Sequence, residues 1–310
     1  MNSAVCTLFE GGYHFGVAAL TNSLYRHGFR GVIWAGYRGA LPPWAHPLVE
    51  QNGWSEFRVA EGCVLRFLPV QTERHLTNFK PEFVLKLWTA QAAEADAIFY
   101  FDPDIVLRCG WDFFERWVSD AVALCEDVNS PFPITHPLRK QWGSVYAREK
   151  MPLRFSSDIY VNAGFIGVSR AHRGFLDAWK KVQEIMDAEL GGLDKTHLDL
   201  GGRQHPFSKT DQDALNITMG AATEPVSCIG KEGMNLIPGG FTMSHTIGAA
   251  KGWNAPFLRN ALAGYPPSSA IKDYFDYVEE PIRLYSRGCL RWKKTRLKIA
   301  AMIGRFYRRS

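Results

Sequence analysis

Apolar runs alternate with amphipathic stretches through the first hundred residues, and this alternation most restricts the fold that the chain can adopt. The apolar runs cover residues 4–9, 31–36, 63–70 and 97–102. Between them, residues 15–28 and 81–95 repeat their apolar side chains with helical spacing. Buried strands that alternate with helices predict a largely parallel, open α/β sheet. Such a sheet binds ligands beyond the carboxyl ends of its strands.

The second half of the chain is less regular. We predict a strand with a glycine bend over 159–170, helices over 172–190 and 210–222, and a strand with a Gly-rich loop over 241–253. Thr210 is predicted to cap the second of these helices. No internal repeat or low-complexity linker is visible. We therefore predict one domain over residues 1–280 and an appended tail over residues 281–310.

Composition restricts the class of protein. The 310 residues are 46% hydrophobic and 22% charged, which is typical of a globular chain and not of a disordered one. No apolar run of about 18 residues predicts a membrane-spanning helix, and the first residues do not resemble a signal peptide. Six cysteines are scattered without a C-x-x-C pair. This favours a reducing, cytoplasmic compartment and no structural zinc.

Two acidic residues close together follow the fourth apolar run. Asp102 and Asp104 flank Pro103, and residues i and i+2 of an extended segment project to the same side. Carboxylates this close repel each other unless a positive charge lies between them. They indicate half of an octahedral site for Mg²⁺ or Mn²⁺, a metal that commonly holds a diphosphate. The simpler alternative is a turn in which both carboxylates are solvated.

The same segment also resembles the first motif of haloacid-dehalogenase-type phosphatases, an apolar strand followed by Asp-x-Asp-x-Val. In that interpretation Asp102 is a nucleophile and Asp104 an acid/base. Three predicted strands precede Asp102, whereas that motif normally lies on the first core strand. No later acidic pair in a recognisable loop completes a phosphatase metal site. The phosphatase is therefore kept as the alternative.

Three further segments accompany this acidic pair, in a fixed order. They are "YVNAGFIGV" over 160–168, "DQDALN" over 211–216 and "HTIGAAKGW" over 245–253. The last has the pattern His-x-x-Gly-x-x-Lys-x-Trp. With Asp102-Pro103-Asp104, the set resembles the family-8 glycosyltransferases, which include bacterial lipooligosaccharide galactosyltransferases and glycogenin-like enzymes. The resemblance extends from Val5 to Trp253.

The resemblance implies a fold and an activity. The fold would be GT-A, a Rossmann-like open mixed sheet flanked by helices. The donor would be a UDP-sugar and the acceptor a glycan or glycolipid, as in the synthesis of cell-surface polysaccharide or lipooligosaccharide. The reaction would depend on a divalent metal, usually Mn²⁺ with Mg²⁺ as the alternative, and would retain the anomeric configuration.

The resemblance also implies roles for individual residues. Asp102, Asp104 and His245 would bind the metal, and an imidazole among oxygen ligands favours Mn²⁺ over Mg²⁺. Lys251 would neutralise the departing diphosphate. The other expected contacts are Gly248 at the diphosphate, Asp211 at the sugar hydroxyls, Gln212 beside the anomeric carbon, Asn162 and Ala163 along the sugar, Lys86 near the donor, and Thr7, Leu8 and Tyr13 around the uracil.

Simpler structural explanations exist for several of these residues. His245 alone would be read as a core histidine and Lys251 as a surface lysine, and Asp211 suits a helix N-terminus. At the position beside the anomeric carbon stands Gln212, an amide and not a nucleophilic carboxylate. We therefore expect front-face attack and no covalent intermediate. A UDP-sugar-binding protein without catalytic activity is a further alternative.

The tail is the strongly basic part of the chain. Ten Lys or Arg and no acidic residue follow Glu280, although the whole chain carries a net charge of only +5. Wound as a helix, the tail has Trp292, Ile299, Met302, Ile303, Phe306 and Tyr307 on one face and Lys293, Lys294, Lys298, Arg305, Arg308 and Arg309 opposite, with Arg296 and Leu297 breaking the pattern. This predicts a helix in the interface of an anionic membrane, at its cytoplasmic face. The alternatives are packing on the protein's own body and a disordered tail. Nucleic-acid binding is not expected, because the body is acidic.

Overall fold

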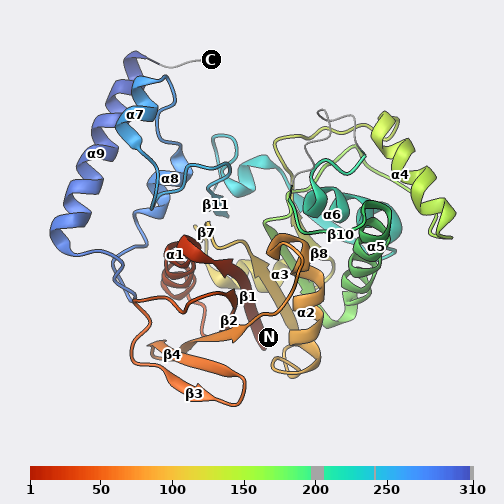
Figure 1. Ribbon diagram of the computed structural model, residues 1–310, viewed down its shortest axis with the longest axis horizontal. Helices are drawn as coiled ribbons and strands as arrows, with labels where there is room; N and C mark the ends of the chain where they lie inside the picture. Colours follow the sequence, from red (N-terminus) through yellow and green to blue (C-terminus); the bar gives the residue numbers. More distant parts are fainter. Residues whose placement is uncertain (197–205, 241, 308–310) are drawn as a thin grey trace. The chain divides into compact units, whose positions relative to one another are not determined.

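The computed structural model describes residues 1–196, 206–240 and 242–307, and the chain divides into two compact units (Figure 1). Unit 1 contains residues 1–8, 69–101 and 112–231. Unit 2 contains residues 9–68, 102–111 and 232–310. The predicted boundary at residue 280 lies within unit 2 and stays a prediction.

The strands of unit 1 form a mixed sheet in the order β10-β8-β9-β6-β1. Their bounds are Ser3–Glu10 for β1, Ala97–Phe101 for β6, Val122–Cys125 for β8, Phe165–Ser169 for β9 and Val226–Ile229 for β10. β1 pairs in parallel with β6, and β8 with β10. β9 is antiparallel to β6 and β8. The predicted mixed α/β fold is confirmed.

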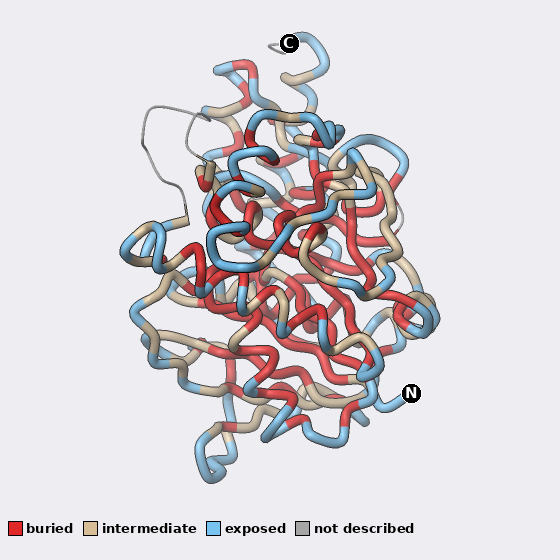
Figure 2. Tube along the Cα trace, turned by 90° about the vertical axis from the view of Figure 1, so that its right-hand side faces the viewer, coloured by how far each residue is buried: buried red, intermediate tan, exposed pale blue. Residues whose placement is uncertain are grey.

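Burial along the chain follows the predicted strands. All five residues of β6 are buried, as its unbroken apolar run predicts. Figure 2 shows the same pattern along the chain, in which long buried stretches alternate with exposed turns. The first polar side chain after β6 is therefore that of Asp102, directly at the end of a core strand.

Helices flank the sheet of unit 1. They are η2 (Leu76–Phe79), α2 (Lys80–Thr89), α3 (Trp111–Trp117), α4 (Pro137–Arg148), η3 (Arg170–His172), α5 (Gly174–Leu190) and α6 (Thr210–Ala221). α5 packs against α2 and α6, and it buries side chains at helical spacing, among them Phe175, Trp179, Val182 and Met186. It ends at Gly191, whose φ of 71° is left-handed. The predicted helix over 172–190 is confirmed.

The start of α6 differs from the prediction in one respect. The helix begins at Thr210, but the residue in the N-cap position is Lys209. The Thr210 hydroxyl donates to Asn78 Oδ1, 2.8 Å away, and so holds α6 to the segment before α2. Thr210 therefore makes a tertiary hydrogen bond and does not cap the N-terminus of α6, because its hydroxyl faces the core.

The strands of unit 2 fall into two groups. The order β2-β5-β4-β3 comprises β2 (Gly31–Arg38), β3 (Val49–Gln51), β4 (Trp54–Ala60) and β5 (Cys63–Pro69). The β3–β4 hairpin turns at Asn52-Gly53, and the φ of Gly53 is 92°. A separate antiparallel pair comprises β7 (Ile105–Leu107) and β11 (Met243–His245).

Unit 2 also contains helices, two of which pack on this second strand pair. They are η1 (Gly11–Tyr13), α1 (His14–Arg26), η4 (Lys231–Met234), α7 (Phe257–Leu262), α8 (Ser269–Tyr274) and α9 (Arg287–Phe306). α1 and α8 both contact β7 (Figure 1). The Leu107 backbone N–H donates to Ser23 Oγ, 3.0 Å away, so α1 fixes the position of β7.

The tail folds onto unit 2 as α9. Leu290, Leu297 and Ala300 are buried in a hydrophobic cluster with residues of α7 and α8. This is the packing on the protein's own body that the sequence left as an alternative. Leu297, which does not fit the predicted apolar face, lies on the side of α9 that packs against unit 2. The predicted apolar face is nevertheless exposed at Trp292, Met302 and Phe306, whose exposed fractions are 56%, 55% and 88%. Arg308 and Arg309 lie outside the described residues.

Candidate functional site

Two carboxylates and an imidazole converge in unit 2. Asp102 and Asp104 lie in the turn between β6 and β7, and His245 is the last residue of β11. Because β11 pairs with β7, His245 lies opposite Ile105, next to this turn. One ligand atom from each of the three side chains lies within 4.8 Å of the other two. The structure brings together the three residues that the sequence assigns to a metal.

The spacing of this cluster fits a divalent cation. Adjacent ligands of an octahedral ion lie about 3 Å apart and opposite ligands about 4 Å apart. His245 Nε2 lies 3.3 Å from Asp104 Oδ1, close to the adjacent spacing. Nδ1 of His245 is buried, and no described residue is its hydrogen-bond partner. Two carboxylates and one imidazole suit Mn²⁺ or Mg²⁺, so the cluster is a candidate divalent-metal site.

Lys251 contacts the same cluster. Its Nζ donates hydrogen bonds to Asp104 Oδ2 and to the Thr246 carbonyl oxygen, and the Lys251 and Asp104 side chains are only 7% and 6% exposed. Burial alone would raise the pKa of Asp104, but the neighbouring His245 and Lys251 hold it well below its usual range. Asp104 is therefore a carboxylate at neutral pH, in contact with a buried cation.

The loop after β11 carries the remaining residues of this motif. Gly248 has a φ of 82°, and a Cβ there would meet nothing within 4 Å. The left-handed backbone at position 248 favours glycine, and the space beside it is open. The Trp253 ring lies 5.5 Å from the Tyr13 ring, edge to face, and Lys251 Nζ lies 5.9 Å from the Tyr13 ring centre. Tyr13, predicted at the uracil, thus belongs to the surroundings of Lys251.

α1 packs directly against the turn that carries Asp102 and Asp104. A Cβ built on Gly16 would lie 2.2 Å from the Pro103 carbonyl oxygen. Only glycine lets α1 approach the turn this closely. The position of the two carboxylates therefore depends on a helix residue that carries no ligand.

Gly16→Ala is expected to weaken Mn²⁺ binding about 10–100-fold, the usual effect of displacing the support of a metal ligand. The added methyl group must push the turn away from α1. Calorimetric titration with Mn²⁺ measures the affinity, and thermal unfolding checks the fold. Gly288→Ala is the matched control, because a Cβ on this helical glycine of α9 meets nothing within 4 Å. Unchanged affinity in Gly16→Ala would contradict the role of α1.

A second cluster of predicted residues lies in unit 1. Lys80, the first residue of α2, is fully buried. Its Nζ donates to the Ala163 carbonyl oxygen at 2.8 Å and lies 3.3 Å from Asp211 Oδ2. Gln212 follows Asp211 at the start of α6, and its Nε2 is buried. The structure thus joins the Asn-Ala-Gly segment to the start of α6 through a lysine.

Lys86, the lysine predicted near the donor, does not join this cluster. Its side chain is 66% exposed and pairs with Glu82 at 2.7 Å, one helical turn away. The lysine of α2 that contacts Ala163 and Asp211 is Lys80. Sequence analysis missed it because it began the helix at Pro81 and expected a lysine to face solvent.

Asn162 and its neighbours are held by buried polar contacts. Asn162 Nδ2 donates to Asp127 Oδ2, 2.6 Å away, and Asn162 Oδ1 accepts from the Gly164 backbone N–H. Asn216 of α6 accepts from the Val161 backbone N–H and donates to the Val161 carbonyl oxygen. The sequence analysis missed Asp127. Its position after β8, at another strand end, was the available signal.

The two residues predicted to wall the uracil from β1 are buried in unit 1. Thr7 is 0% and Leu8 is 4% exposed. The Thr7 hydroxyl has no hydrogen-bond partner among the described residues. Their role as base contacts stays a prediction.

Comparison with known proteins is informative for solved structures. No profile of a known protein family matches the chain, and no curated protein matches it. Among solved structures, the chain is similar to the bifunctional glycosyltransferase WbbM in its apo form, with a TM-score of 0.50 and 15% identity. The similarity covers 95% of this chain and 51% of that one, so this chain spans about half the length of WbbM. It shows a fold shared with a glycosyltransferase.

Proposed function

We propose that this protein is a metal-dependent glycosyltransferase that moves a hexose from a UDP-sugar to a glycan or glycolipid. The observation that carries the proposal is the cluster of Asp102, Asp104 and His245 with Lys251 bound to it, in a fold shared with a glycosyltransferase. Mn²⁺ suits this donor set best. The ion would supply positive charge at the diphosphate, and a member of family 8 would retain the anomeric configuration.

Different residues of the chain have different roles in this reaction. The acceptor oxygen forms a bond to the anomeric carbon while the bond from that carbon to the diphosphate oxygen breaks. The acceptor hydroxyl loses its proton to the departing diphosphate oxygen, and the products are UDP and the glycoside. Lys251 neutralises charge on the diphosphate, with Gly248 beside it. Asp211, which contacts Lys80, accepts hydrogen bonds from the sugar hydroxyls. Asn162 and Ala163 lie alongside the donor sugar. Gln212 beside the anomeric carbon is an amide, which favours front-face attack.

The first experiment is a panel of UDP-sugars with Mn²⁺, read as UDP release. UDP release from at least one of them, abolished by EDTA and restored by Mn²⁺, is the expected result. Release of phosphate from a generic phosphoester without a UDP-sugar would identify a haloacid-dehalogenase-type phosphatase instead. Binding of UDP and Mn²⁺ without turnover would identify a UDP-sugar-binding protein that is not a catalyst.

The exposed face of α9 favours an anionic membrane as a partner. No described helix is long and apolar enough to cross a membrane. α9 exposes Trp292, Met302 and Phe306 and carries basic residues at 291, 293, 294, 296, 298 and 305 without an acidic one. An apolar face next to basic residues binds a membrane interface. We propose peripheral attachment at the cytoplasmic face, where the acceptor is a glycolipid.

The protein is expected to sediment with anionic vesicles at low salt, and Trp292→Gln with Phe306→Gln is expected to weaken this by at least about tenfold, because each ring contributes roughly 1.5–3 kcal/mol when buried. Substitution is a better test than truncation, because Leu290 and Leu297 belong to the core of unit 2. Ile134→Gln, at an exposed site outside α9, is the control. A wild-type protein that does not bind anionic vesicles would remove support for the membrane and for a lipid-linked acceptor.

A further inference from the structure

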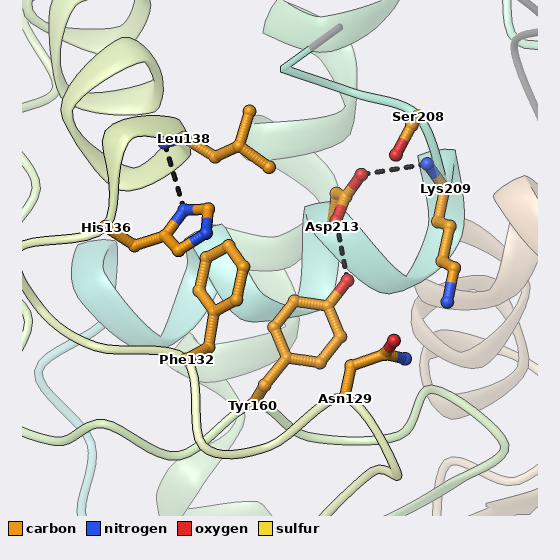
Figure 3. A pocket seen from close by; sticks show the side chains of 8 residues that line it. All are labelled: Asn129, Phe132, His136, Leu138, Tyr160, Ser208, Lys209 and Asp213. Carbon is orange, nitrogen blue, oxygen red and sulfur yellow. Dashed lines mark hydrogen bonds between the residues drawn. The ribbon is translucent and has the colours of Figure 1, made fainter. Parts of the chain in front are cut away.

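A cavity of about 270 Å³ lies in unit 1 between the segment before α4 and the start of α6 (Figure 3). Tyr160 and Asp213, which line it, belong to the motif segments 160–168 and 211–216, but no lining residue was among the individual site residues predicted from the sequence. Cavities for drug-sized ligands measure about 300–1,000 Å³. This one therefore suits a smaller ligand, about the size of one monosaccharide.

The floor of the cavity is a buried hydrogen-bonded pair. The Tyr160 hydroxyl donates to Asp213 Oδ1 at 2.6 Å, and the Lys209 backbone N–H donates to Asp213 Oδ2 at 2.8 Å. Both side chains are almost fully buried, and burial raises the pKa of Asp213 to about 6. At neutral pH Asp213 is mainly a carboxylate, and each of its oxygens has a further lone pair for a ligand hydroxyl.

One wall of the cavity is apolar and fixed. The rings of Phe132 and His136 stack with their centres 4.0 Å apart, and Leu138 lies beside them. His136 Nδ1 accepts the Leu138 backbone N–H at 3.2 Å, which places the ring proton on Nε2 in the neutral form. This wall offers carbon surface to a ligand.

The opposite side is polar. Lys209 lies across the cavity from His136 (Figure 3), and Asn129 and Ser208 also line it. Within the described residues, the Lys209 ammonium makes no hydrogen bond or ion pair, and its charge acts on Asp213 across the cavity. The cavity thus has an apolar wall together with groups that donate and groups that accept hydrogen bonds, and it carries both signs of charge.

We propose that this cavity binds one monosaccharide unit of the acceptor. A sugar ring presents carbon-bound hydrogens on its faces and hydroxyl groups around its rim, and each hydroxyl both donates and accepts. The apolar wall suits the carbon-bound hydrogens of a ring face. The rim hydroxyls are matched by the polar side chains of Asp213, Lys209, Ser208 and Asn129. The inference rests on the proposed function, because only a glycosyl transfer gives the bound sugar the role of acceptor.

The position of the cavity on α6 supports this role. Asp211, which contacts Lys80 and is proposed for the donor sugar, lies two residues before Asp213 on the same helix. Residues two apart on an α-helix point to different sides, about 200° around the axis. The start of α6 therefore directs Asp211 and Asp213 to different sides, so that one carboxylate faces the side proposed for the donor sugar and the other faces the cavity.

Saturation-transfer NMR with methyl β-galactoside, methyl β-glucoside and methyl β-N-acetylglucosaminide tests the proposal on the full chain, without nucleotide or metal. At least one glycoside is expected to give a signal with the wild-type protein. Lys209→Met, which keeps the length of the side chain and removes its charge, is expected to weaken binding at least about tenfold, the effect of one hydrogen bond to a charged group. Ser208→Phe, which places a ring in the cavity, is expected to abolish it.

Lys140→Met is the matched control, because Lys140 is exposed on the neighbouring α4 and does not line the cavity; its binding should equal that of the wild type. Binding that persists in both Lys209→Met and Ser208→Phe, or no binding of any glycoside, overturns the proposal. UDP release is measured separately. If UDP is released but no glycoside binds, the inference fails and the proposed function stands. If a glycoside binds at the cavity but no UDP-sugar is turned over, the proposed function fails and with it the acceptor role.

Discussion

Asp104→Ala is expected to lower sugar transfer by about 10²–10³-fold or more, the range seen when one preorganised electrostatic group is removed from an active site. The substitution removes a metal ligand and also the partner of Lys251. Turnover is measured as UDP release with excess Mn²⁺, which tests whether a high metal concentration replaces the lost ligand. Activity close to that of the wild type would exclude Asp104 from the metal site.

The same substitution is expected to destabilise the protein by about 3–5 kcal/mol, because the Lys251 ammonium stays buried without its carboxylate. Asp102→Ala is the matched variant. Asp102 lies at the same turn but is more exposed than Asp104, the carboxylate that accepts the Lys251 hydrogen bond. It is expected to lose activity with a smaller loss in the free energy of unfolding. Urea unfolding separates the two variants, and an equal loss in both would contradict the role given to the buried pair.

Lys80→Met is expected to lower the free energy of unfolding by about 3 kcal/mol and to reduce turnover as well. It leaves the Ala163 carbonyl oxygen and Asp211 without their buried cationic partner. With Asp211 no longer fixed, the side of α6 that is proposed to bind the donor sugar loses its orientation. Urea unfolding and UDP release measure the two effects.

Lys86→Met provides the control on the same helix. Its pair with Glu82 is exposed and one turn apart, so its loss should change stability by no more than about 0.5 kcal/mol. Turnover should stay at the wild-type level. If Lys86→Met reduces activity more than Lys80→Met, the original prediction from sequence is right and the structural assignment of Lys80 is wrong.

The contrast between these two lysines shows what the sequence could and could not predict. Helical periodicity indicated α2, and a lysine at position 86 fitted its solvent face. Burial of Lys80 follows only from tertiary structure, because a charged side chain is buried where partners far apart in the sequence meet it. Its partners here lie 83 and 131 residues away.

The candidate metal ligands were easier to predict, because two of the three lie in one short motif. An apolar run that ends in Asp-Pro-Asp marks a core strand and its ligand-binding end directly. His245 lies 141 residues beyond Asp104, as their numbers show. Its place beside them came from the resemblance to a family and not from periodicity. The β7–β11 pairing that brings it there joins strands of only three residues each, too short for a pattern to predict.

Two other elements escaped the sequence analysis for different reasons. The β3–β4 hairpin has an Asn-Gly turn, a strong local signal that was overlooked. The packed side of α9 could not be read from its sequence. Leu290 and Leu297 are one heptad apart and bury against α7 and α8, while more conspicuous aromatic residues remain exposed. Amphipathicity indicates that a helix has an apolar face, but it does not indicate which surface covers that face.

Direct measurement of Mn²⁺ binding tests the central claim, that Asp102, Asp104 and His245 form a metal site that serves a nucleotide sugar. Electron paramagnetic resonance follows the loss of the free Mn²⁺ signal when protein is added, with and without UDP. The account predicts one ion per chain, tighter binding with UDP, and no binding in Asp102→Ala. Mn²⁺ that stays free in the presence of the wild-type protein and UDP would contradict it.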